Sequence, residues 1–279
     1  MKQELIKQST SLTFAKYKYT VHEKRIIYAI MNSLQSKLIF SNKSNSKETS
    51  NKLEEFCKED YYVYLKKRDL VIEGSKNYKV AKSAVQSLLK KLIEFPKFSD
   101  KETQVFTGII QEAEINKRDS TVKLKVSKEL LPALVFISNG YTKYSLESAF
   151  NCSSSYTMRL YEYIKQWHDI WKDSLVFTLK VQDLRDFLCL GKKYPTSNDV
   201  RNHIILKAAE ELAEKADIWF DIKEPVKEGK KVVGWKINIY KKEDVKAPKK
   251  SMDNVPQNPP LSFDYGIMNQ PKQNKNKKS

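Results

Sequence analysis

The stretch that decides the fold is VQDLRDFLCLGKKYPTSNDVRNHIILKAAEELAEKA, residues 181–216. Apolar residues at helical spacing predict a short helix over 181–190 and a longer one over 199–216, with a Gly- and Pro-containing turn over 191–195 between them. Two β-rich segments follow, 218–222 and 232–240, on either side of the charged turn 224–231. A short helix, a tight turn, a longer helix and a β-hairpin make the helix-turn-helix plan with a wing.

The first half of the chain shows the same order of elements. Its long helix over 21–38 has Thr20 and Glu23 spaced as a capping box. The remaining expected segments are a polar lead-in over 1–11, a loop over 41–52, a strand over 61–64, one or two helical turns over 65–72, a helix over 78–95 stopped by Pro96, strands over 104–110 and 121–126, and a turn over 116–120. The second half begins with a helix over 156–171 and a strand over 175–179.

The length of 279 residues favours two domains. The predicted fold class is therefore α+β, with two tandem winged-helix (helix-turn-helix) domains over 12–138 and 139–243. A Lys-, Pro- and Asn-rich tail over 244–279 follows. The tail has seven lysines against two acids in residues 246–279 and few apolar residues, so we expect it to be disordered.

The charge balance points to a polyanionic partner. Fifty-one Lys and Arg oppose 34 Asp and Glu, which gives a formal charge of +17. Clustered positive charge of this size favours nucleic acid or an acidic membrane surface. The longest apolar run, 130–137, contains Pro132 and falls short of the roughly 18 residues that a membrane span needs. The N-terminus has no apolar signal-peptide core, so we expect a cytoplasmic protein with no membrane partner.

Cofactor, metal and catalytic motifs are missing from the sequence. Cys57, Cys152 and Cys189 form no C-x-x-C pair, and the three histidines form no ligand pair. Neither a phosphate-binding P-loop nor a dinucleotide-binding glycine motif occurs. We therefore expect no metal, no cofactor and no enzymatic activity.

Over about residues 12–240, the chain resembles the iteron-binding plasmid replication initiators, a family with two winged-helix domains. This chain is similar to the family's opening motif at Tyr19, Thr20, Glu23, Arg25 and Ile26. It is similar to the most specific family motif at Tyr156, Arg159, Leu160, Tyr161 and Glu162. Further matches are the segment 104–110, Leu184-Arg185, and the set Tyr194, Asp199, Val200, Ala208, Glu211 and Leu212. One departure concerns base readout, because the family often has an arginine run where this chain has Arg201-Asn202-His203.

The resemblance implies a function that composition alone does not reach. It implies binding to repeated sites in double-stranded origin DNA, opening of the adjacent duplex, and recruitment of a host initiator and a replicative helicase. It also implies a monomer on the repeats and a homodimer that represses its own gene.

The longer helix of the second half carries the candidate DNA contacts. A helical wheel places Asn202, His203 and Lys207 opposite the apolar stripe, near the end that enters a major groove. Asn can pair with adenine, and Lys with guanine or phosphate. The predicted phosphate contacts are Lys192, Lys193, Thr196, Ser197, Asn198 and Arg201 around the helix start, with Lys227, Lys230 and Lys231 on the wing.

The matching helix of the first half presents Lys79, Lys82 and Gln86 on one face. We expect these residues to contact the DNA backbone or a second groove. Arg159, within the most specific family motif, is instead expected in a structural ion pair.

Three alternatives remain open from sequence. A winged-helix transcriptional repressor would bind its operator without melting the duplex. A rolling-circle nicking enzyme would need a histidine metal cluster beside its tyrosine nucleophile, and the chain lacks the histidine pair. An RNA-binding protein is not supported by a known RNA-binding motif.

Overall fold

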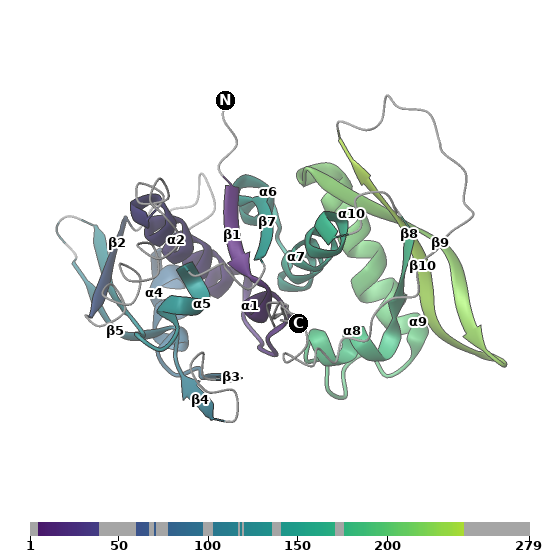
Figure 1. The fold of residues 1–279 in the computed structure, drawn as a ribbon, viewed down its shortest axis with the longest axis horizontal. Helices are drawn as coiled ribbons and strands as arrows, with labels where there is room; N and C mark the ends of the chain where they lie inside the picture. Colours follow the sequence, from purple (N-terminus) through teal and green to yellow (C-terminus); the bar gives the residue numbers. More distant parts are fainter. Residues whose placement is uncertain are drawn as a thin grey trace, which may run out of the picture.

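The computed structural model describes residues 5–38, 60–66, 70, 78–96, 103–116, 118, 120–135, 141–170 and 176–242. The predicted loop over 41–52 and the tail over 244–279 lie outside the described residues, as does most of the segment 65–72. Figure 1 shows two groups of helices and strands on either side of a central helix, α7.

The first group is built on α2, Val21–Leu38, where the predicted capping box is confirmed. The Thr20 amide donates to the Glu23 carboxylate over 2.6 Å, and the Glu23 amide donates to the Thr20 hydroxyl over 3.3 Å. These two bonds satisfy amide groups that the first helical turn leaves without partners. The apolar stripe is fully buried, at Ile26, Ile27, Ile30, Met31 and Leu34.

An antiparallel sheet packs beside α2 in the order β2-β6-β5. Its strands are β2 (Tyr61–Lys66), β5 (Ile110–Ile115) and β6 (Thr121–Val126). Alternate residues of β6 are buried, at Val122, Leu124 and Val126, because successive side chains of a strand point to opposite faces. The predicted turn after β5 is confirmed by the Asn116 amide, which donates to the Thr121 carbonyl.

Two predictions in this group were wrong in part. Helix α4 spans Tyr78–Leu88 and ends before residue 95, because Ile93–Pro96 forms β3. The predicted single strand over 104–110 is divided between β4 (Gln104–Thr107), which pairs with β3, and β5, which pairs with β6. Local apolar spacing does not reveal such long-range pairing.

The N-terminal segment is not a polar lead-in, so that prediction was also wrong. Strand β1, Leu5–Ser9, pairs antiparallel with β7, Tyr141–Ser145. Gln8 is polar but buried. Its side-chain NH₂ group donates to the Thr13 hydroxyl, and its side-chain oxygen accepts from the Tyr144 hydroxyl. The short helices α1 (Thr10–Phe14), α5 (Leu131–Val135) and α6 (Leu146–Asn151) complete this group.

Helix α7, Ser155–Ile170, matches the predicted helix over 156–171. Every residue from Thr157 to His168 is buried, so the helix has no wide solvent face. It packs against β7 and α2 on one side and α10 on the other. This helix therefore connects the cores of the two groups.

The second group confirms the predicted helix-turn-helix and wing. Its elements are β8 (Val176–Lys180), α8 (Val181–Phe187), α9 (Ser197–Val200), the π-helical segment η3 (Arg201–Ile205), α10 (Leu206–Lys215), β9 (Ile218–Glu228) and β10 (Lys231–Lys241). The sheet order is β8-β10-β9. The hairpin is longer than predicted, because the strands continue through the charged residues to a turn at Gly229 and Lys230.

Candidate nucleic-acid interface

The three segments α9, η3 and α10 follow one another without a break and are called the 197–215 helix below. Its buried face consists of Val200, Ile204, Ile205, Ala208 and Leu212, as the helical wheel predicts. Asn202, His203 and Lys207 are all exposed on the opposite face. The sequence therefore correctly predicts which side of this helix is exposed.

The start of this helix has its hydroxyl groups already engaged. The Thr196 hydroxyl donates to the Asp199 carboxylate over 2.7 Å and accepts from the Asp199 amide over 3.1 Å. The Thr196 hydroxyl and the Thr196 backbone amide both donate to the Asp199 carboxylate, and these two bonds lower the pKa of Asp199. The Ser197 hydroxyl donates to the Val232 carbonyl on β10 over 2.8 Å, which joins the helix start to the wing close to its tip. Thr196 and Asn198 are both exposed in this turn.

Two of the candidate base-contacting residues, Asn202 and His203, contact neighbouring side chains. The Arg201 guanidinium donates to the side-chain oxygen of Asn202, Oδ1, over 3.2 Å. This contact leaves the Asn202 amide hydrogens available as donors. The His203 ring stacks on Tyr194, with centroids 5.3 Å apart and planes 25° apart.

Arg185 holds the turn between α8 and the 197–215 helix. Its guanidinium donates to the carbonyl oxygens of Gly191 and Tyr194. Both residues have positive φ angles, 56° and 53°, which a tight turn requires. The sequence pointed to Arg185 only as part of a family motif, and the structure shows it as a positioning residue for exposed Lys192 and Lys193.

The wing carries positive charge at its tip. Lys227, Lys230 and Lys231 are exposed, and none of the three has an ion pair within the described part of the chain. Nearer the base, Lys223 and Lys236 are paired with Asp221 and Glu224, over 2.7 and 2.5 Å. The charge available to a partner therefore increases toward the tip.

The first group presents a separate basic face on α4. Lys79, Lys82 and Gln86 are exposed there, opposite buried Ala81, Ala84, Val85 and Leu88. Lys91 follows the helix and is committed elsewhere, because its ammonium lies 2.6 Å from Glu23. The predicted site residues thus form two surfaces, one on α4 and one on the 197–215 helix with its wing.

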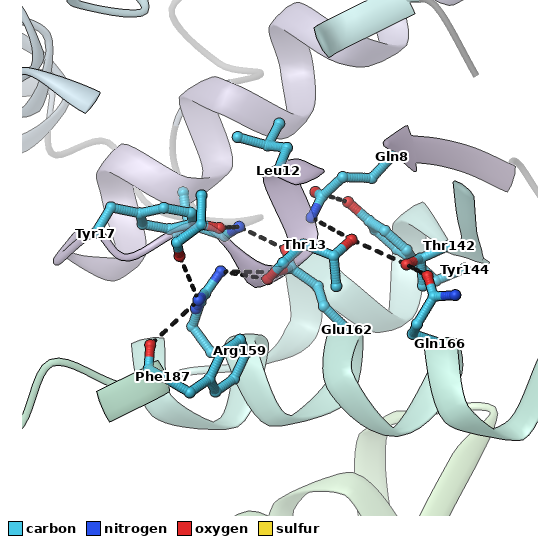
Figure 2. Close-up of polar contacts among 12 residues, drawn as sticks. Gln8, Leu12, Thr13, Tyr17, Thr142, Tyr144, Arg159, Glu162, Gln166 and Phe187 are labelled. Atoms are coloured by element: carbon cyan, nitrogen blue, oxygen red, sulfur yellow. Dashed lines mark hydrogen bonds and ion pairs between the residues drawn. The ribbon is translucent and has the colours of Figure 1, made fainter. Parts of the chain in front are cut away.

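The family motif that contains Arg159 and Glu162 lies mainly in the protein interior rather than on a surface that could contact a ligand. The Arg159 guanidinium donates to the carbonyls of Thr13, Ala15 and Phe187 over 2.9 to 3.2 Å and lies 3.7 Å from Glu162 (Figure 2). This confirms the structural role expected for Arg159. The Tyr28 hydroxyl also donates to Glu162, and burial, with help from that carboxylate, raises the pKa of Tyr28.

A metal site, a reactive thiol and a membrane span each place requirements on the described residues. There, no group of three or more His, Cys, Asp or Glu side chains is arranged to hold a metal ion. Cys152 is buried, and burial raises the pKa of its thiol to about 12. Among the described helices, none combines the length and apolar character that crossing a bilayer requires.

Comparison with known proteins agrees with this architecture. The family described as "Initiator Replication protein, WH1" matches residues 5–165, and that described as "Initiator Rep protein, WH2" matches residues 180–239. Comparison with curated protein sequences gives no significant match. A solved structure, "Crystal structure of Pi initiator protein in complex with iteron DNA", matches with a TM-score of 0.64 and 18% identity, over 88% of this chain and all of that one. The two family matches together cover most of the chain, which therefore belongs to the initiator replication proteins and carries both of their winged-helix domains.

Proposed function

We propose that this protein binds repeated sites, iterons, in the double-stranded DNA of a plasmid origin and starts replication there. The observation that carries the proposal is the pair of exposed basic surfaces, one on each winged-helix domain. Lys79 and Lys82 on the first and Lys192, Lys193 and Lys207 on the second are exposed and unpaired among the described residues. The solved Pi initiator, which shares this fold, is bound to iteron DNA.

The proposal divides the work between the two surfaces. On the 197–215 helix, Asn202 reads an adenine, and Lys207 reads a guanine or holds a phosphate. Around the start of the helix, the turn lysines and the amides near Asn198 bind phosphates, with Arg201 and His203 beside them. Lys230 and Lys231 follow the backbone along the wing, while α4 adds backbone or second-groove contacts through Lys79, Lys82 and Gln86.

The finer steps come from the family rather than from this geometry. We propose that binding opens the adjacent duplex, that a host initiator and a replicative helicase are then recruited, and that a homodimer represses the protein's own gene. We also retain domain limits of 12–138 and 139–243, a non-enzymatic role and a cytoplasmic location as parts of the proposal.

The binding experiment uses the full chain and a pool of random duplexes, from which the bound fraction is sequenced. We expect enrichment of one sequence that recurs as direct repeats in an origin. A contact that neutralises about 6–10 phosphates loses on the order of 10³–10⁵ in affinity between 50 and 200 mM salt. No enrichment, or affinity that does not change with salt, would contradict the proposal.

Duplex opening separates an initiator from a repressor. Permanganate oxidises unpaired thymines, so footprinting on a supercoiled plasmid that carries the selected repeats beside an A·T-rich segment reports melting. We expect reactive thymines in that segment only when protein is present. Full occupancy of the repeats without reactive thymines would favour the repressor.

A further inference from the structure

A cleft between the two domains has the composition of an anion site. Its volume is about 540 Å³, and it lies where the segment 17–20, the residues before β3, the start of α7 and the α8–α9 turn meet. The lining residues include five cationic ones, and none of the described residues that line it is acidic. The cationic residues are Lys18, Lys24, Lys91, Arg159 and Lys193.

Three of these cations already have carboxylate partners. Lys24 and Arg159 share buried Glu162, and Lys91 is paired with Glu23. Lys18 and Lys193 are exposed and have no ion pair among the described residues. They come from different domains, so the cleft keeps one uncompensated charge from each.

Two buried donors at the cleft also have no acceptor. The Tyr19 hydroxyl has no hydrogen-bond partner among the described residues, although the residue is only 6% exposed. The same holds for Nε of Arg159, a residue that is 4% exposed. A buried donor without an acceptor is costly, and both residues line the cleft, so a small shift of either side chain toward a bound anion would supply the missing acceptor.

The position of the cleft suggests the source of the anion. Figure 1 places the β3–β4 hairpin and the α8–α9 pair along the same side of the molecule. Lys91 and Leu92 follow the end of α4, and Lys193 precedes the 197–215 helix, so the cleft lies between the two helices that carry the proposed DNA-binding surfaces. A duplex bound to both surfaces would therefore bring its backbone close to the cleft.

We propose that this cleft binds a backbone phosphate of the DNA strand that runs between the two DNA-binding surfaces. Lys18 and Lys193 contact this phosphate from opposite domains. The inference rests on the proposed function and adds a contact that couples the two domains. One shared phosphate fixes the spacing between the domains, so the cleft sets the distance between the two groove contacts along the DNA.

The test uses the full chain and the selected repeat, with single neutral methylphosphonate linkages placed one at a time along the strand between the two contacted grooves. We expect one linkage to lower wild-type affinity about 3- to 10-fold and to reduce the salt slope by about one, as the loss of a single phosphate contact predicts. Lys18→Ala and Lys193→Ala should each weaken binding to unmodified DNA and respond less than the wild type to that same linkage, because each variant keeps only one of the two contacts. Lys143→Ala, which removes an exposed lysine on β7 away from the cleft, is the control.

Two outcomes would overturn the inference. In the first, both variants show the wild-type response at every linkage. In the second, inorganic pyrophosphate raises the melting temperature of the free protein in a Lys193-dependent way while DNA binding is unaffected, which would make the cleft a small-anion site. Failure of the proposed function is distinguishable, because it appears as equal wild-type affinity for repeat and scrambled duplexes.

Discussion

The ammonium of Lys24 on α2 lies 2.5 Å from the carboxylate of Glu162 on α7, and both side chains are almost completely buried. The Tyr17 and Tyr28 hydroxyls share this pair, one accepting from Lys24 over 2.9 Å and the other donating to Glu162 over 2.7 Å. Glu162, one residue of the family motif, is therefore the anionic centre of a buried polar cluster, and its charge serves the fold.

Replacing Glu162 with Gln should strongly destabilise the protein. The variant leaves Lys24 and Arg159 buried without a carboxylate, and breaking a buried pair costs about 3–5 kcal/mol. Tyr28→Phe is the control, because it removes one hydrogen bond to the carboxylate, worth about 1.5–3 kcal/mol, and keeps the charges paired. Urea unfolding followed by circular dichroism measures both. A loss below about 1 kcal/mol for Glu162→Gln would contradict the role assigned to this carboxylate.

Helices were the part of the fold best predicted from sequence. The helix over 21–38 and its capping box depend on spacing between neighbours in the chain, and both are confirmed. Strand pairing depends on distant residues, so the β1–β7 and β3–β4 pairs were missed. Gln8 was misjudged for the same reason, since its buried partner Tyr144 lies far away in the sequence.

The candidate site was predicted unevenly. The wheel identified the exposed face of the 197–215 helix, because burial there follows the local apolar pattern. It could not show that the Thr196 and Ser197 hydroxyls have protein partners, one of them on β10. The sequence Lys16-Tyr17-Lys18-Tyr19 contains a signal for the cleft, because tyrosine and lysine alternate as in an extended segment. In the structure the two tyrosines are buried and the two lysines are exposed.

Gly234 permits a close approach of two strands in the second domain. A Cβ added there would lie 2.7 Å from the Leu179 carbonyl oxygen and 3.2 Å from Cα of Lys180. Gly234→Ala should therefore separate β8 from β10 and cost about 1–3 kcal/mol of stability, the usual range for overpacking.

Gly229→Ala at the tip of the wing is the matched comparison. No atom lies within 4 Å of its added Cβ, but its φ of +58° is unfavourable for alanine by about 1 kcal/mol. Thermal unfolding should rank the variants wild type, Gly229→Ala, Gly234→Ala. Equal melting temperatures for wild type and Gly234→Ala would show that the sheet absorbs the extra methyl group.

Acid should weaken the contact between the 197–215 helix and the start of α7. Burial raises the pKa of Glu211, but hydrogen bonds from the Ser153 side chain and backbone outweigh it and leave the pKa below its ordinary value of 4.5. A carboxylate with a depressed pKa contributes stability above its unfolded pKa and loses it as the pH falls through the folded value. Stability should therefore decrease as the pH drops below about 4.5.

Glu211→Gln isolates this contribution. The variant should lose about 0.5–1 kcal/mol at neutral pH, after allowance for partial exposure, and should show a shallower loss of stability in acid. Glu210→Gln changes the exposed neighbour on the same helix and is the control. Urea unfolding between pH 3 and pH 7 measures the slopes. A Glu211→Gln slope as steep as that of the wild type would assign the acid sensitivity to other groups.

The two DNA surfaces should respond differently to substitution. If Asn202 reads an adenine, Asn202→Ala should cost about 1–3 kcal/mol on the selected site and relax specificity at one base pair. If Lys79 holds a phosphate, Lys79→Ala should weaken all sequences alike and reduce the salt slope by about one. Both residues are exposed and outside the buried stripes, so both variants should keep the wild-type melting temperature.

The measurement is a set of titrations with cognate and scrambled duplexes at two salt concentrations. Arg201→Ala belongs in the set, because Arg201 donates to the Asn202 carbonyl oxygen and its loss frees that oxygen to accept from adenine. We expect Arg201→Ala to lower the salt slope while the base preference at the Asn202 position is retained. If Asn202→Ala instead weakens cognate and scrambled DNA equally, Asn202 is a backbone contact, and base reading must come from elsewhere on the exposed face, with Lys207 the next residue to test.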